Sequence, residues 1–154
     1  AKDLPLSEIT LRRYEKPTNL TDRELIRKLC LSVGLLQPGD SRNVIVDVFL
    51  VLINNKEPLT SEKINELVIE LRKKENLPLK GIAGSNIRRQ LKRLKDLFLI
   101  ENVKNEYRIN ENETLINIFE EKIEKFYIKG IIDRIKDYLR TVKWFMNLKK
   151  ILFY

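Results

Sequence analysis

The feature that most constrains the fold is an apolar run from Val44 to Ile53, interrupted only by Asp47. In NVIVDVFLVLINN the apolar residues cover nearly every side of a helix, and such a helix is stable only when other elements surround it. The run is about half as long as a bilayer-spanning helix. We therefore predict a helix that starts after Asp40 or Ser41 and lies at the centre of a folded core.

Amphipathic helices are predicted on both sides of this central run. Thr21 and Glu24 have the spacing of a capping box, so a first helix begins at Thr21 and ends near residues 34–38. After the central run, Thr60 or Ser61 caps another helix whose apolar residues recur every three or four positions.

A fourth helix is predicted in SNIRRQLKRLKDLFLI, residues 85–100, which follows a loop over residues 76–84. Ser85 is its predicted cap. On a helical wheel the predicted buried stripe consists of Ile87, Leu91, Leu94 and Phe98, with Leu97 at its edge. Two extended runs follow, residues 99–103 and 107–109, and their short connection predicts a hairpin.

The whole chain is expected to be mainly α with a small β-hairpin, an α+β fold. We predict an N-terminal arm over residues 1–19, a domain over residues 20–110 and a C-terminal helical extension over residues 111–154. The extension is helical from about Glu113 and is expected to break near Lys129 and Gly130.

Three helices followed by a hairpin, with the segments TSEKINELV, SNIRRQLKRLKDLFLIE and KNE, resemble winged helix-turn-helix transcription regulators of bacteria and archaea, such as the MarR and ArsR groups. The resemblance covers roughly residues 41–110. It implies a recognition helix, residues 85–97, in the DNA major groove and a wing, residues 98–110, on the backbone. Phe98 stands where those regulators usually have glycine.

Positive charge is concentrated on the fourth helix. The chain has a formal net charge of +8 and a pI near 9.6, which favours an anionic partner. The fourth helix carries five cations and Asp96 as its only acid, whereas residues 62–75 of the preceding helix mix both signs. Because like charges one turn apart destabilise a helix, we interpret this face as a nucleic-acid contact. The alternative is a solvated face.

Each residue of this predicted interface has an expected role. Ser85, Asn86 and Arg89 lie early and outward, where a recognition helix reaches base edges. The expected phosphate contacts on the helix are Arg88, Lys92, Arg93 and Lys95, and Lys80 precedes them in the loop. The expected wing contacts are Lys104 and Arg108.

The C-terminal extension has apolar residues at the alternating three- and four-residue spacing of helices that pack along their length. This seam consists of Ile128, Ile131, Ile135, Tyr138, Val142 and Phe145. We expect it to form a homodimer that places two DNA-binding domains on two half-sites. The alternative is that the seam folds back as part of the core.

Several chemistries are excluded or disfavoured. The chain has no histidine, and Cys30 is its only cysteine, so histidine catalysis, a histidine metal site, an intrachain disulfide and a thiolate cluster are excluded. No phosphate-binding glycine loop is present. We expect no enzyme activity, cofactor or metal, and a cytoplasmic protein, because residues 1–16 lack the apolar core of a signal peptide. The alternative function is a winged-helix adaptor that binds protein or RNA in a transcription, replication or RNA-processing assembly.

Overall fold

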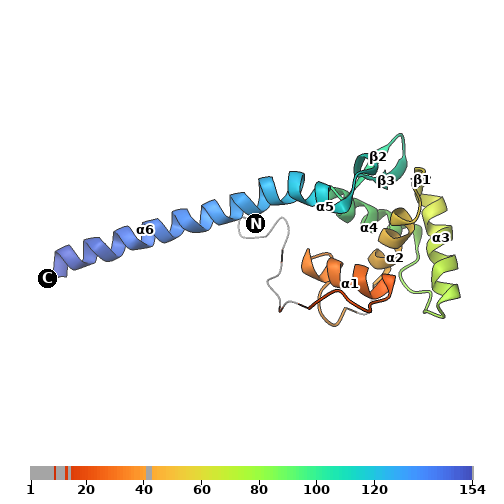
Figure 1. Cartoon of the computed structure of the whole chain (residues 1–154), viewed down its shortest axis with the longest axis horizontal. Coiled ribbons are helices and arrows are strands. Elements are labelled where there is room, and N and C mark those ends of the chain that lie inside the picture. Colours follow the sequence, from red (N-terminus) through yellow and green to blue (C-terminus); the bar gives the residue numbers. More distant parts are fainter. Residues whose placement is uncertain (1–8, 10–12, 14, 41–42, 154) are drawn as a thin grey trace. The chain divides into compact units, whose positions relative to one another are not determined.

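The computed structural model describes residues 9, 13, 15–40 and 43–153. It is mainly helical with a small three-stranded antiparallel sheet, so the predicted α+β class is confirmed (Figure 1). The chain divides into two compact units, Ala1–Asn112 and Glu113–Tyr154. Most of the predicted arm, and Ser41 as a helix start, lie outside the described residues.

The first unit is built around the central apolar helix, α2 (Val44–Ile53). Every residue of α2 from Val44 to Leu52 is buried, as its sequence predicts. Helices α1 (Asp22–Ser32), α3 (Ser61–Lys74) and α4 (Gly84–Asp96) all contact α2, and Figure 1 shows them around it. An all-round apolar helix is thereby removed from water on every side.

Two helices begin where the sequence predicts. The capping box of α1 is confirmed, because the Glu24 N–H donates to Thr21 Oγ1 (3.2 Å) and the Thr21 N–H donates to Glu24 Oε2 (3.0 Å). Thr60 caps α3, since its hydroxyl oxygen accepts from the Lys63 N–H at 3.2 Å. Each such cap satisfies a backbone donor that has no partner within its helix.

The sheet consists of β1 (Leu59–Thr60), β2 (Ile100–Val103) and β3 (Glu106–Ile109) in the order β1-β3-β2. The predicted hairpin is confirmed: β2 and β3 pair with Ile100 opposite Ile109. Strand β1 was not predicted, because two residues carry no periodicity of their own. It pairs Leu59 with Tyr107 and thereby attaches the hairpin directly to the start of α3.

The second unit is helical over most of its length. Thr114 caps α5 (Leu115–Ile118), which continues through a π-helical run, η2 (Phe119–Ile128), into α6 (Lys129–Phe153). The predicted break near Lys129 and Gly130 is wrong, because Lys129 has helical angles, φ −59° and ψ −44°. Only the hydrogen-bonding pattern changes there. None of the helices in the described ranges combines the length and apolarity required to cross a membrane.

Candidate nucleic-acid interface

Helix α4 begins without a side-chain cap. The predicted cap at Ser85 is wrong: the helix starts at Gly84, and the Ala83 carbonyl accepts from the N–H groups of Asn86 and Ile87 at 2.9 and 3.0 Å. Ser85 is therefore inside the first turn and exposed. The first turn contains no acid, so the partial positive charge of the helix N-terminus adds to that of the cations.

The buried side of α4 follows the predicted stripe until its last residue. Ile87, Leu91 and Leu94 are fully buried. Phe98 was expected to continue the stripe, but its side chain is 37 % exposed, and Leu97 is buried in its place. The helix has already ended, because the Leu99 N–H donates to the Leu94 carbonyl (3.2 Å) and the Phe98 N–H to the Lys95 carbonyl (2.9 Å).

This pair of bonds is the Schellman pattern, which needs a left-handed residue at its centre. Phe98 occupies that position with φ 62°, a conformation that glycine adopts most readily. Phe98 stands where winged helix-turn-helix regulators usually have glycine, and it adopts a backbone conformation that glycine favours. The turn redirects the chain from α4 into β2.

The opposite side of α4 carries four exposed cations, which we call the outer face of α4: Arg88, Arg89, Lys92 and Lys95. Lys92 Nζ lies 3.0 Å from Asp96 Oδ2, but both side chains are more than half exposed. An exposed pair four residues apart contributes only about 0.3–0.5 kcal/mol. Within the described ranges, no carboxylate forms an ion pair with the other three.

Arg93 does not belong to this outer face, contrary to the helical wheel. It is partly buried, and its Nη2 donates to the Leu35 carbonyl oxygen at 2.7 Å while its Nη1 donates to Gln90 Oε1 at 2.8 Å. Burial, and then the neighbouring charge of Arg89, lower the pKa of Arg93. Arg93 fixes the segment after α1 against α4. Its guanidinium is therefore directed into the fold and not toward a phosphate, contrary to the prediction.

Asn86 is also turned inward rather than toward a base edge. Its Nδ2 donates to the Gly81 carbonyl at 2.7 Å, and its Oδ1 accepts from Gln90 Nε2 at 2.9 Å. Gly81 has φ +77°, and a Cβ there would lie 3.2 Å from Asn86 Nδ2 and 3.1 Å from Val44 Cγ2. Asn86 therefore anchors the loop before α4, and it is removed from the predicted base contacts.

The two cations that were predicted as wing contacts differ in exposure. Lys104 is exposed at the tip, where Lys104 and Asn105 both have positive φ (52° and 64°), as in a tight two-residue hairpin turn. Arg108 is partly buried, and its Nε lies 2.5 Å from Glu101 Oε1 on the paired strand. The charge of Arg108 is thus neutralised within the sheet. Lys80, in the loop before α4, is exposed as predicted.

An ionic cluster that the sequence reasoning missed holds the first unit together. Asp47 is fully buried, and Arg72 Nη1 donates to its Oδ2 at 2.6 Å. Arg23 Nη2 donates to Asp47 Oδ1, and Arg23 Nε donates to Glu75 Oε2 at 2.5 Å. We call these four residues the Asp47 cluster. Burial lowers the pKa of Arg23, but hydrogen bonds and attraction from Asp47 and Glu75 raise it overall.

The Asp47 cluster also positions α4 indirectly. Arg72 was expected on a solvated face of mixed charge, but the residue is only 4 % exposed. Its Nε donates to the Pro78 carbonyl at 2.7 Å, so it fixes the loop between α3 and α4. The signal in the sequence was Asp47 itself, because an acid inside an apolar helix requires a cationic partner.

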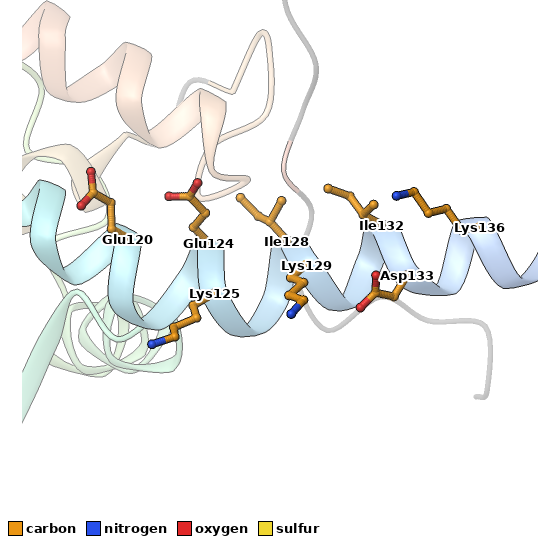
Figure 2. A pocket seen from close by; sticks show the side chains of 8 residues that line it. All are labelled: Glu120, Glu124, Lys125, Ile128, Lys129, Ile132, Asp133 and Lys136. Carbon is orange, nitrogen blue, oxygen red and sulfur yellow. The ribbon is translucent and has the colours of Figure 1, made fainter.

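Most of the C-terminal seam is exposed on its own helix, and both the dimer and its fold-back alternative stay predictions. The exposed fractions of Ile135, Val142 and Phe145 are 49 %, 52 % and 53 %. Figure 2 shows an open hollow on η2 and α6, with Glu120, Glu124, Ile128 and Ile132 projecting from one side of the helix. Its remaining lining residues are Lys125, Lys129, Asp133 and Lys136.

The described residues contain no cluster of three or more histidine, cysteine, aspartate or glutamate side chains placed to hold a metal ion. Comparisons of the chain with protein-family models, with curated proteins and with solved structures found no match. The candidate interface is therefore described from this chain's own residues. It consists of the outer face of α4, with exposed Lys80 before it and exposed Lys104 after it in the sequence.

Proposed function

We propose that this chain is a DNA-binding transcription regulator whose residues 20–110 form a winged helix-turn-helix domain with an extra N-terminal helix. The order of three helices, α2, α3 and α4, followed by the β2–β3 hairpin supports this proposal. The observation that carries it is the outer face of α4, whose exposed cations have no buried carboxylate partner in the described part of the chain, while the apolar stripe on the opposite side is fully buried. Binding, rather than catalysis, is the activity proposed.

In this proposal the outer face of α4 enters the major groove. The groove admits one α-helix, and residues in its first turns reach base edges. Arg89 is the proposed base contact, because arginine donates to guanine O6 and N7, and Ser85 is a second one. Arg88, Lys92 and Lys95 contact phosphates on either side, with Lys80 and Lys104 at the ends of the site.

The proposal predicts different outcomes for the two kinds of contact. Arg89→Ala should weaken binding to a selected duplex by about 1–3 kcal/mol and relax its base preference. Lys92→Ala should weaken binding to all sequences similarly and make the salt dependence shallower by about 0.9 in log–log slope. Fluorescence anisotropy on duplexes selected from a random pool measures both effects.

The matched control is Lys63→Ala, which removes an exposed lysine from α3 that pairs with Glu66 at 3.3 Å. This variant should bind duplex DNA as the parent does. If Arg89→Ala and Lys92→Ala also retain parental binding to every duplex, α4 is not a recognition helix.

We further propose that the exposed seam of α6 pairs two copies of the chain, so that one dimer carries two DNA-binding units. An exposed apolar stripe along a helix is a recognised site of helix–helix association. Sedimentation at micromolar concentration tests this part alone: a dimer is expected, and a monomer would contradict it without affecting the role of α4.

The exposed stripe also supports a second candidate, a winged-helix adaptor that binds a protein or RNA within a larger assembly. In that case duplex binding should be weak and indifferent to base sequence, and the outer face of α4 should bind single-stranded or folded RNA at least as well. Competition between matched duplex DNA and RNA for the same labelled chain separates the two candidates.

A further inference from the structure

The apolar seam, which starts at the end of η2 and continues along α6, has a defined length and defined ends. It begins at Ile128 and ends at Phe145, a distance of about 26 Å along an α-helix. On one side it is widened by Ile132, Leu139 and Met146, which are 45–61 % exposed. An apolar surface of this kind remains in contact with water unless another helix covers it.

The residues that end the seam carry opposite charges. Glu124 lies four residues before Ile128, and Figure 2 shows its carboxylate on the same side of the helix as Ile128. Lys149 lies four residues after Phe145 and seven after Val142, so it falls on the same stripe. Both are exposed, and no ion pair within the described ranges involves either one.

Charge also changes sign along the unit as a whole. Residues 113–124 contain four glutamates and one lysine, whereas residues 140–150 contain one arginine, three lysines and no acid. Two such helices attract when they run in opposite directions, because each acidic end then meets a basic end. Running in the same direction, they bring like charges together at both ends.

We propose that two copies pair through η2 and α6 in antiparallel orientation, with Glu124 of one copy opposite Lys149 of the other. This register also places Ile128 opposite Phe145, Ile131 opposite Val142 and Ile135 opposite Tyr138, so the apolar seams coincide over their full length. The two-fold symmetry forms the Glu124–Lys149 pair twice. The inference rests on the proposed pairing of two copies and adds its direction.

The antiparallel direction determines where the two DNA-binding units are attached. Each first unit joins its helix at the N-terminal end, near Leu115. In the proposed register the two Leu115 residues lie on the order of 60 Å apart along the paired helices. That spacing exceeds the roughly 34 Å between half-sites one DNA turn apart, so the dimer would connect more widely separated sites.

A charge exchange tests the direction. Glu124→Lys and Lys149→Glu, each alone, replace two attractive pairs per dimer with two repulsive ones. Each should weaken dimerisation about tenfold, measured by sedimentation equilibrium. The double variant, with both charges exchanged, should recover the parental dimer dissociation constant to within about threefold.

A parallel dimer would respond differently. In a parallel dimer, Glu124 would face Glu124 and Lys149 would face Lys149. Each single exchange would replace one repulsive pair by another, so the dimer dissociation constant would change little. Single variants that dimerise like the parent, or a double variant that fails to recover, would overturn the proposal.

Cross-linking gives an independent measurement on the folded full chain. With a short bifunctional thiol reagent, Glu124→Cys and Lys149→Cys should each give no covalent dimer, and the double variant should give one. Two copies of residue 124 lie about 37 Å apart in the antiparallel register. The parent chain is the control, since its only cysteine, Cys30, is buried. Efficient cross-linking of Glu124→Cys alone would establish the parallel direction.

These measurements use no DNA, so their failure is distinguishable from failure of the proposed recognition helix. A parent chain that sediments as a monomer would overturn the pairing together with its direction. Loss of binding in Arg89→Ala is measured separately and does not depend on that result.

Discussion

Two sets of basic side chains in the first unit have opposite environments. In the Asp47 cluster, Arg72 and Arg23 donate to one fully buried carboxylate, and Arg23 also contacts Glu75. On the outer face of α4, four cations are exposed, and among the residues that the structure describes only Lys92 of these four pairs with a carboxylate, that of exposed Asp96. The first set is internally neutralised, and the second is available to an external anion.

The difference shows that the type of residue does not determine its role. A buried acid with two arginines connects α1, α2 and α3, and removing one partner leaves a buried charge uncompensated. An exposed cation contributes little to folding, so its replacement costs little stability. The same substitution to alanine should therefore affect stability in one set and ligand binding in the other.

The largest effect on stability is expected for Asp47→Asn. Two arginines would remain largely buried beside a neutral amide, and the free energy of unfolding should fall by about 3–5 kcal/mol. Urea denaturation followed by circular dichroism measures this change. The matched control is Asp96→Asn on exposed Asp96, which should change stability by less than about 0.5 kcal/mol. Equal effects of the two variants would contradict the distinction.

A smaller effect on stability is expected at α4, where Arg93 is partly buried and Arg88 is exposed. Arg93→Ala removes charged hydrogen bonds to the Leu35 carbonyl and Gln90 and should lower stability by about 1.5–3 kcal/mol. It should leave the salt dependence of DNA binding unchanged. Arg88→Ala should make the salt dependence of DNA binding shallower and change the free energy of unfolding by less than about 0.5 kcal/mol. A shallower salt dependence in Arg93→Ala would restore Arg93 to the interface.

The smallest expected change in stability concerns the N-terminal ends of α3 and α4. Thr60→Ala removes the hydroxyl that caps α3 and should lower stability by about 1 kcal/mol. Ser85→Ala removes an exposed hydroxyl that caps nothing, so stability should change by less than about 0.5 kcal/mol. Parallel urea titrations of both variants give the answer. A cost for Ser85→Ala as large as that for Thr60→Ala would show that Ser85 does cap α4.

The arrangement of the first unit was largely predictable because its signals are local. The apolar run of α2, the capping box at Thr21 and the stripe beginning at Ile87 each lie within one element. Strand β1 was not predictable, because two residues become a strand only through pairing with β3. The position of Phe98 was misassigned because the period of α4 ends at the Schellman turn.

The candidate site was predictable in its location but not in its membership. The exposed positions of Arg88, Arg89, Lys92 and Lys95 follow from the helical period. The hydrogen bond from Arg93 to the Leu35 carbonyl does not follow from the helical period, because Leu35 is 58 positions away in the sequence. Asn86 likewise depends on a loop conformation that Gly81 permits. Such partners are fixed by tertiary packing, which no local pattern encodes.

The most direct test of the central claim is the salt dependence of duplex binding by the parent and by a variant with alanine at Arg88, Arg89, Lys92 and Lys95. On a duplex that holds one DNA-binding unit, the five proposed phosphate contacts predict a log–log slope of about −4.5 for the parent, and the two that remain predict about −2 for the variant. Both proteins should unfold at nearly the same urea concentration. A variant whose slope equals that of the parent would show that the outer face of α4 does not contact DNA.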